Sequence, residues 1–149
     1  MAAAGLRIGF RGTRHGMTDR QKEDLRQILA ESRPDEFHHG DFVGADAEAH
    51  GIVRTAYPAI RVVIHPPIRK TFRAFCQGDE ERPARGYIAR NRELVGTCHI
   101  LVAAPRSMEE QQGSGTWAVV RYARVRKMTT RRVKHRGRRY RRASPPTTA

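Results

Sequence analysis

The chain has 149 residues, which is enough for one domain with a buried core and short for two. Its formal net charge of +14 is unevenly spread, because residues 111–149 hold 12 basic and no acidic side chains. Two cysteines without a C-x-x-C pair exclude a disulfide framework and a zinc ribbon. Neither a membrane-span-length apolar run nor a signal-peptide pattern is present, so we expect a cytoplasmic protein that does not enter a membrane.

The first half of the chain alternates short apolar runs with segments of helical spacing. Leu6–Phe10 and Glu36–His39 are expected strands. The helix between them is predicted to begin at Thr18, an N-cap with Gln21 as its capping-box partner. Asp46–Tyr57 has small and apolar residues at helical spacing and is expected to form a second helix.

The second half continues the alternation after one interruption. Ile60–His65 is a continuous apolar run, typical of a strand buried on both faces of a parallel sheet. Residues 66–85 are polar, with aromatic residues, prolines and glycines, and are expected to be irregular. Tyr87–Thr97 is then an expected helix, His99–Ala104 an expected strand and Thr116–Arg126 an expected helix.

This order predicts an α/β fold: a Rossmann-like, doubly wound, mostly parallel sheet of four to five strands with helices on both faces. The domain is expected to span residues 1–128. Residues 129–149 form a basic tail, in which Thr129–Val133 is either an edge strand or irregular. From Lys134 onward the arginine-rich and then SPPTTA composition predicts disorder.

Turns rich in glycine, threonine and arginine follow the expected strands. In an open α/β sheet, ligands bind beyond the carboxyl ends of the strands, where these turns converge. Arg14 is suited to clamp a phosphate, and Asp46 to accept from a ribose hydroxyl or a base. The GSGT turn opens a helix whose free amides favour an anion. The expected ligand-binding residues are Gly12, Thr13, Arg14, Gly40, Asp41, Gly44, Asp46, Arg90, Asn91, Gly113, Ser114, Gly115 and Thr116.

The alternative interpretation is that the glycines only make tight turns and that Arg90–Arg92 is a solvated basic helix face. Helical spacing cannot place all three side chains of Arg90–Arg92 on one face, so we expect Asn91 and one arginine to point toward the ligand. Among the histidines, His39 with Asp41 and His65 is the best metal candidate. No metal site and no required cofactor are predicted.

Four segments in a fixed order carry a resemblance: GADAEAH, ARNRELVG, HILVAAP and GSGTW. They resemble the Rossmann-type core of the DNA-processing protein A family, and they also fit the wider SLOG superfamily, which includes the Lonely Guy hydrolases. With the opening GFRGTRHGMT, the chain looks most similar to small stand-alone SLOG proteins of bacteria and phages. The resemblance covers roughly residues 6–124. It implies a nucleotide-derived ligand, and pairing through helices into a homodimer.

One departure bears on catalysis. Lonely Guy hydrolases have a catalytic glutamate three residues after the Gly-Thr pair, and Val119 occupies that place here. An apolar side chain cannot act as a general acid. Asp46 and Glu48 are the remaining catalytic candidates, with Asp41 as a further one. The spacing of Asp46 and Glu48 on a helix points them in different directions.

Three functions therefore stay open. The first is the binding of a nucleotide or another phosphorylated small molecule, as a sensor or carrier. The second is binding of single-stranded DNA or RNA, supported by the basic tail. The third is hydrolysis of an N-glycosidic bond in a nucleotide. The expected nucleic-acid contacts are Arg131, Arg132, Lys134, Arg136, Arg138, Arg139, Arg141 and Arg142.

Overall fold

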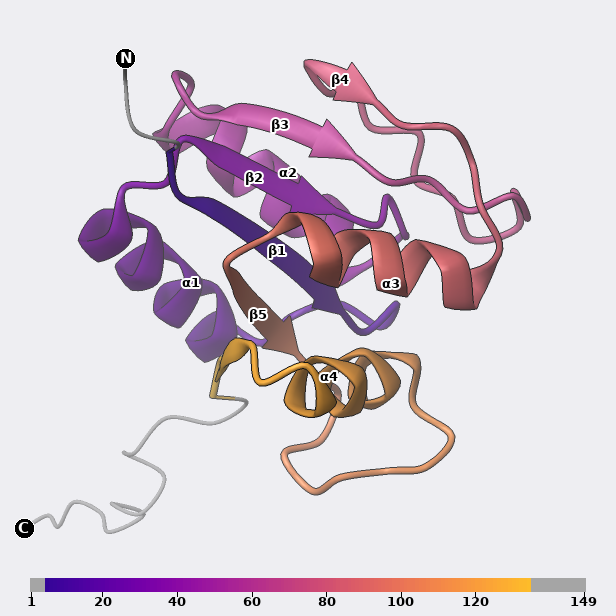
Figure 1. Cartoon of the computed structure of the whole chain (residues 1–149). Helices are drawn as coiled ribbons and strands as arrows, with labels where there is room; N and C mark the ends of the chain where they lie inside the picture. Colours follow the sequence, from indigo (N-terminus) through magenta and orange to yellow (C-terminus); the bar gives the residue numbers. More distant parts are fainter. Residues whose placement is uncertain (1–4, 135–149) are drawn as a thin grey trace, which may run out of the picture.

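The apolar runs expected to form strands do so in the computed structural model, which describes residues 5–134 (Figure 1). The strands are β1 (Arg7–Gly12), β2 (Glu36–His39), β3 (Arg61–Ile64), β4 (Glu80–Glu81), β5 (Ile100–Ala104) and β6 (Thr129–Arg132). The helices are α1 (Asp19–Ser32), α2 (Ala45–Ala56), α3 (Tyr87–Thr97) and α4 (Gly115–Val125). One parallel sheet joins all six strands in the order β4-β3-β2-β1-β5-β6. The predicted fold class is confirmed, with six strands instead of four to five.

The two additional strands lie at the two edges of the sheet. β4 falls inside the segment expected to be irregular, where Glu80 and Glu81 pair with the end of β3. β6 pairs with β5 over four residues, although its own side chains are largely exposed. Val133 follows it, is 1% exposed, and donates its amide to the Ala103 carbonyl, so one apolar residue anchors this edge. The rest of the basic tail, residues 135–149, lies outside the described residues.

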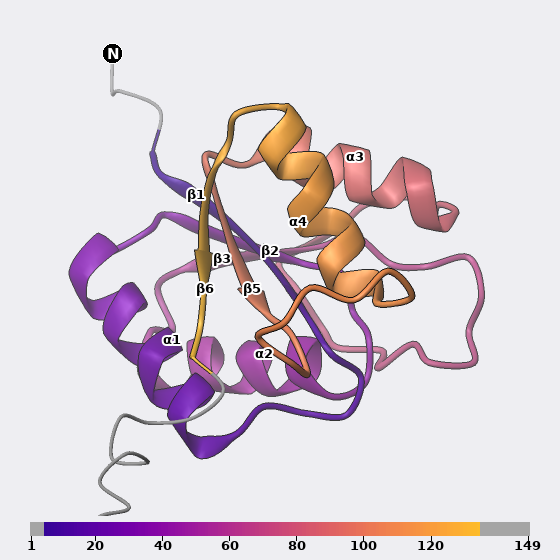
Figure 2. The ribbon, with the colours of Figure 1, turned by 90° about the horizontal axis from the view of Figure 1, so that it is seen from below.

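Helices cover both faces of the sheet, α1 and α2 on one side and α3 and α4 on the other (Figure 2). Side chains of α1 and α2 share one buried apolar cluster with alternate residues of the strands, Ile8 and Phe10 among them. Side chains of α3 and α4 pack in a second cluster with Leu101 and Ala103. Because side chains alternate along a strand, Arg11 faces the α3 and α4 side. The capping box at the start of α1, Thr18 with Gln21, is present as predicted.

The strand order changes direction between β1 and β5: β2, β3 and β4 extend the sheet on one side of β1, and β5 and β6 extend it on the other. β1 leads into α1 on one face, whereas β5 leads into α4 on the opposite face. The two strands are neighbours, and Gly12 pairs with Ala104 at their carboxyl ends. The loops that follow them therefore diverge, which opens the space where doubly wound sheets bind ligands. Within residues 5–134, no helix has both the length and the apolar character that crossing a membrane requires.

Candidate functional site

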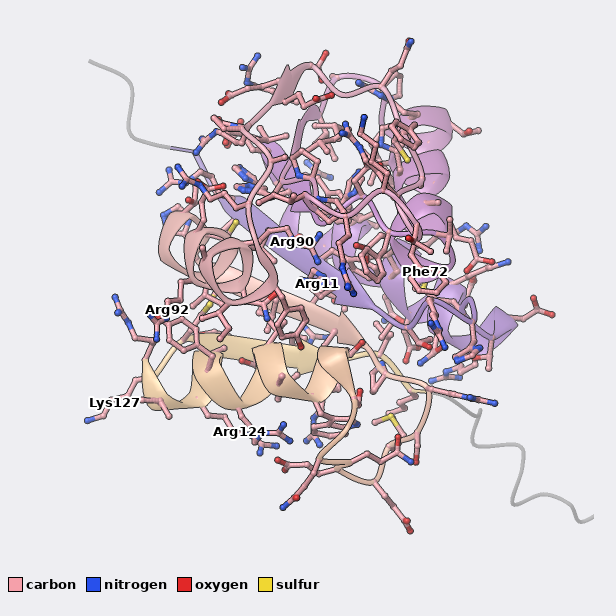
Figure 3. The ribbon with its side chains drawn as sticks, turned by 90° about the vertical axis from the view of Figure 1, so that its right-hand side faces the viewer. Arg11, Phe72, Arg90, Arg92, Arg124 and Lys127 are labelled. Carbon is pink, nitrogen blue, oxygen red and sulfur yellow. The ribbon has the colours of Figure 1, made fainter. Side chains whose placement is uncertain are left out.

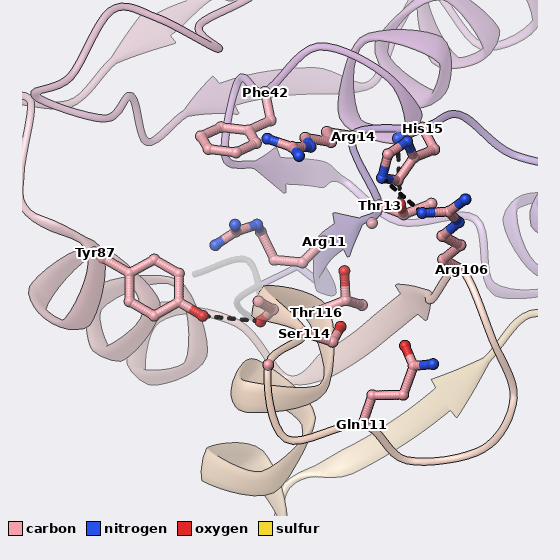
Figure 4. Close-up of a pocket in the computed structure, with 13 residues that line it drawn as sticks. Arg11, Thr13, Arg14, His15, Phe42, Tyr87, Arg106, Gln111, Ser114 and Thr116 are labelled. Carbon is pink, nitrogen blue, oxygen red and sulfur yellow. Dashed lines mark hydrogen bonds between the residues drawn. The ribbon is translucent and has the colours of Figure 1, made fainter.

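A cavity of about 610 Å³ lies at the divergence of the loops after β1 and β5 (Figure 4). Its walls come from the β1–α1 loop on one side and from the residues that lead into α4 on the other. Three arginines and no aspartate or glutamate line it. The lining residues are Arg11, Gly12, Thr13, Arg14, His15, Phe42, Tyr87, Arg106, Gln111, Gly113, Ser114, Gly115 and Thr116.

The floor of this cavity is the side chain of Arg11, which is only 3% exposed. Its Nη1 donates to the Asn91 Oδ1 at 2.6 Å, and its Nε lies 3.7 Å from a carboxylate oxygen of Asp46. Its buried Nε donates no hydrogen bond to any residue in 5–134. A guanidinium has five N–H donors and a full positive charge, and burying it without enough acceptors is costly. An anionic ligand in the cavity would compensate this charge.

A second buried arginine, Arg90, lies beside the first (Figure 3). Its Nη1 reaches the Gly40 carbonyl at 3.3 Å, while its Nε finds no partner among the described residues. Burial, and then the charge of Arg11, lower the pKa of Arg90 to about 10. The Phe42 ring faces both guanidiniums, with centroid distances of 5.1 Å to Arg90 and 5.8 Å to Arg11. Arg90 is therefore charged at neutral pH, and its buried Nε has no hydrogen-bond acceptor among residues 5–134.

Asp46 is the carboxylate nearest to this pair, and it is fully buried. It accepts hydrogen bonds from the backbone amides of Gly12 at 3.0 Å, Gly40 at 3.1 Å and Phe42 at 3.3 Å. Burial raises its pKa, against the opposing effect of Arg11 and of these amides. Asp46 thus ties the ends of β1 and β2 to the following loop. Its oxygens face these backbone amides, and its expected contact with a ribose or a base stays a prediction.

The other two acidic candidates also point away from the cavity. Glu48 accepts from the Met17 amide and lies 3.8 Å from the Lys22 ammonium. Asp41 is fully buried and accepts from Arg73 Nε at 2.8 Å. Neither side chain lines the cavity, so the structure does not bring the predicted catalytic carboxylates to the predicted ligand.

Several predicted ligand residues frame the cavity without lining it, namely Gly40, Gly44 and Asn91. Gly44 has a φ of +89°, and a Cβ there would lie 2.3 Å from the carbonyl oxygen of Arg14. Only glycine therefore allows the β1–α1 loop to rest on the start of α2. The amide of Thr13 donates to the Ala104 carbonyl at 3.0 Å, which fixes this loop against β5.

The wall opposite the arginines is the amino end of α4. Ser114 is its N-cap and accepts from the amide of Trp117. The amides of Gly115 and Thr116 make no hydrogen bond to other residues in 5–134. They carry the positive end of the helix dipole into the cavity. Tyr87 Oη donates to the Gly115 carbonyl at 3.1 Å and so joins α3 to this turn (Figure 4).

Six residues that line the cavity are not among the residues that the sequence predicts. The apolar run predicts that the first strand ends at Phe10, which places Arg11 in the loop, yet β1 continues to Gly12. Arg106 follows β5 directly, and that position was the available signal for it. Partial desolvation, followed by the charges of Arg106 and Arg14, lowers the pKa of His15. The missed residues are Arg11, His15, Phe42, Tyr87, Arg106 and Gln111.

Two histidine clusters lie elsewhere in the sheet. His38, not His39 as expected, meets His65, with 2.8 Å between His38 Nδ1 and His65 Nε2. On the opposite face, one nitrogen from each of His39 and His50 and the Cys76 sulfur all lie within 4.8 Å of one another.

Hydrogen bonding disfavours a metal in this second cluster. The Asp41 amide donates to His39 Nδ1, so a neutral His39 carries its proton on Nε2, which lies 3.0 Å from His50 Nδ1. A protonated nitrogen cannot ligate a metal. Burial also raises the pKa of the Cys76 thiol to about 12, which disfavours the thiolate that a metal binds.

The predicted nucleic-acid contacts are separate from the cavity. Arg131, Arg132 and Lys134 are exposed on and after β6, where they border a groove against α1. Exposed basic residues also lie at the carboxyl end of α4, including Arg124 and Lys127 (Figure 3). The other predicted contacts, Arg136, Arg138, Arg139, Arg141 and Arg142, lie outside the described residues.

Comparisons with models of protein families, with curated proteins and with solved structures gave no match. The resemblance to the SLOG superfamily therefore rests on the quoted motifs alone. It stays a prediction, as does the homodimer that it implies. The case for function is carried by the cavity itself.

Proposed function

We propose that this protein binds a nucleotide or a related phosphorylated small molecule, with the phosphate in the cavity between the β1–α1 loop and α4. The observation that carries the proposal is the buried Arg11 guanidinium at the cavity floor, with a buried Nε donor that no described residue satisfies. Within residues 5–134, Asp46 is the only carboxylate within 4 Å of Arg11 or Arg90, so the two buried cations share one counter-charge and a bound anion would supply a second.

The donors around the cavity suit a phosphate better than a carboxylate or a neutral ligand. Arg11 lies below the ligand, Arg14 and Arg106 lie at the β1 and β5 sides, and the free amides of Gly115 and Thr116 lie opposite. Donors that converge from several directions match the tetrahedral oxygens of a phosphate group. The absence of a lining carboxylate also removes the repulsion that a dianion would meet.

The same geometry weakens the hydrolase alternative. The carboxylates of Asp46 and Glu48 accept hydrogen bonds from backbone amides, and neither residue lines the cavity. Neither therefore reaches the glycosidic bond of a nucleotide bound there. Single-stranded nucleic acid is a second candidate, favoured by the 12 basic and no acidic residues of 111–149. That binding would lose affinity steeply with salt. Binding in the cavity depends less on salt, because the buried charges are screened less.

Isothermal titration calorimetry with ribose 5-phosphate tests the proposal. Arg14→Ala removes an exposed cavity arginine, and Arg11→Met removes the buried one. Each should weaken binding about 10- to 150-fold, the range for a lost hydrogen bond to a charged group. Arg92→Met is the matched control, because Arg92 is exposed on α3 and does not line the cavity.

Equal binding by the parent and both cavity variants would place the ligand elsewhere. No binding of ribose 5-phosphate or of AMP by the parent would refute the proposal. Because Arg14 is exposed, its variant is expected to fold even where the buried Arg11→Met does not.

A further inference from the structure

A second cavity of about 620 Å³ adjoins the first. Phe42 and Tyr87 line both cavities, so the two meet between these rings. The second cavity differs in chemistry, since Pro67, Ile68 and Phe72 supply apolar walls. Ile68 is 61% exposed, Phe72 39% and Tyr87 44%, although large apolar side chains usually avoid such exposure. The two cavities together form one site with a charged half and an apolar half.

The aromatic wall is held rigidly in place. Phe72 belongs to the segment between β3 and α3, which has little regular structure of its own. The Val43 amide donates to the Phe72 carbonyl at 2.9 Å, and the adjacent Arg73 forms an ion pair with the buried Asp41. An isolated β-bridge also pairs the backbones of Pro67 and Arg85, near the two ends of the segment. The rings are therefore positioned before any ligand arrives, which lowers the entropic cost of binding.

The arginines connect the two halves. The Arg14 guanidinium, which lines the first cavity, stacks 4.5 Å from the centroid of Phe72 in the second. Arg90 lines the second cavity, and it is 2% exposed with a buried Nε that no described residue accepts from. Planar guanidiniums and aromatic rings are the groups on which nucleobases stack. Arg90 can also donate to a carbonyl or ring nitrogen of a base.

From these contacts we infer that the second cavity is a nucleobase subsite, and that the ligand is a free nucleoside 5′-phosphate. Its phosphate lies on Arg11 and the start of α4, its sugar passes between Phe42 and Tyr87, and its base lies against Phe72 and Arg90. This inference rests on the proposed function and narrows it. A sugar phosphate would fill only the charged half and leave the apolar walls exposed to water.

The test compares AMP, GMP, CMP and UMP with ribose 5-phosphate, which carries the same phosphate without a base. By calorimetry, the parent should bind at least one nucleotide at least tenfold more tightly than ribose 5-phosphate. Phe72→Ala should weaken binding of that nucleotide by about 5- to 150-fold, the range for one base-stacking contact. It should weaken binding of ribose 5-phosphate by clearly less, since that ligand loses only the support that the Phe72 ring gives to Arg14. Phe72→Trp should retain the nucleotide affinity.

Phe75→Ala is the matched control, because Phe75 lies in the same segment, is 56% exposed and does not line the second cavity. The inference is overturned if every nucleotide binds no better than ribose 5-phosphate, or if Phe72→Ala weakens both ligands equally. In either case ribose 5-phosphate binding that depends on Arg11 leaves the proposed function standing. If the parent binds none of these ligands, the proposed function fails and the inference fails with it.

The 5′-end of a nucleic-acid strand carries the same base and phosphate as a free nucleotide. The trinucleotide 5′-pApApA is therefore compared with AMP at two salt concentrations. We expect AMP to bind at least as tightly as the trinucleotide. Tighter binding of the trinucleotide would overturn the assignment of a free nucleotide.

Discussion

Gly44 immediately precedes α2 and Gly51 lies within it. We expect substitution of alanine at these two positions to change the free energy of unfolding in opposite directions. Gly44 precedes α2 with a φ of +89° and a ψ of −128°, which L-residues rarely adopt. An added Cβ would lie 2.3 Å from the Arg14 carbonyl oxygen, so the loop would have to move by about 1 Å to restore contact. Backbone strain costs about 1–3 kcal/mol and overpacking a similar amount, which predicts a loss of about 2–6 kcal/mol for Gly44→Ala.

Gly51 lies within α2, is exposed, and has nothing within 4 Å of an added Cβ. Gly51→Ala should therefore stabilise the protein by about 0.5–1 kcal/mol, because alanine loses less conformational entropy in a helix. Urea unfolding monitored by the fluorescence of Trp117, the single and buried tryptophan, measures both variants. A change smaller than about 0.5 kcal/mol for Gly44→Ala would refute the reasoning, as would the same sign for both variants. Gly44→Ala should also weaken the binding of ribose 5-phosphate, because the added Cβ displaces Arg14.

Three further predictions concern the scaffold around the site. Thr18→Ala removes the N-cap of α1, whose oxygen accepts from the Gln21 amide, and should lower the free energy of unfolding by about 1 kcal/mol in urea titrations. Burial lowers the pKa of His39 well below 6.5, so the unfolded chain binds a proton that the folded protein refuses. The contribution of His39 to stability is therefore complete above pH 6.5 and is lost as the pH falls, by up to about 1.4 kcal/mol per pH unit. His39→Asn keeps an acceptor for the Asp41 amide and should make the fall in urea midpoints from pH 7 to 5 less steep, and an unchanged slope would contradict this. Arg73→Met leaves the buried Asp41 carboxylate without its ion pair, so chymotrypsin should cleave the β3–α3 segment faster than in the parent, and equal rates would show that the pair does not anchor it.

The order of elements could be predicted because each carries its own local signal. The strands β1, β3 and β5 contain short apolar runs, β2 is a short segment around Phe37, and the helices show apolar residues at helical spacing. β4 has no such signal, since Glu80 and Glu81 are charged and pair only because the chain returns to β3. β6 is arginine-rich, and its place depends on the contact of Val133 with the core. Both edges therefore depend on tertiary contacts that a local pattern cannot contain.

The site was predictable in outline but not in the roles of its charged residues. Glycine and threonine turns after parallel strands point to one edge of the sheet, and that rule placed Thr13, Ser114 and Thr116. The hydrogen bonds of Asp46 could not be predicted, because the amides of Gly12 at the end of β1 and of Gly40 and Phe42 after β2 approach its carboxylate only after folding. The place of Arg11 could not be predicted either, because the apolar run ends at Phe10 and the last two residues of β1, Arg11 and Gly12, resemble a loop in sequence.

The buried arginines connect the stability of the protein with its proposed function. Lowering the pKa of Arg90 from 12.5 to about 10 corresponds to about 3 kcal/mol of disfavoured charge, at about 1.4 kcal/mol per pKa unit. An apolar side chain in its place would avoid this cost, since buried charges without full compensation destabilise a fold. A bound dianion would offset part of the cost through Arg11 and Arg90 together, and ligand at 100 times its Kd would add about 2.7 kcal/mol of stability. The disfavoured charge of Arg90 beside Arg11 therefore supports the proposed site, in which a bound anion would gain affinity by compensating buried charge.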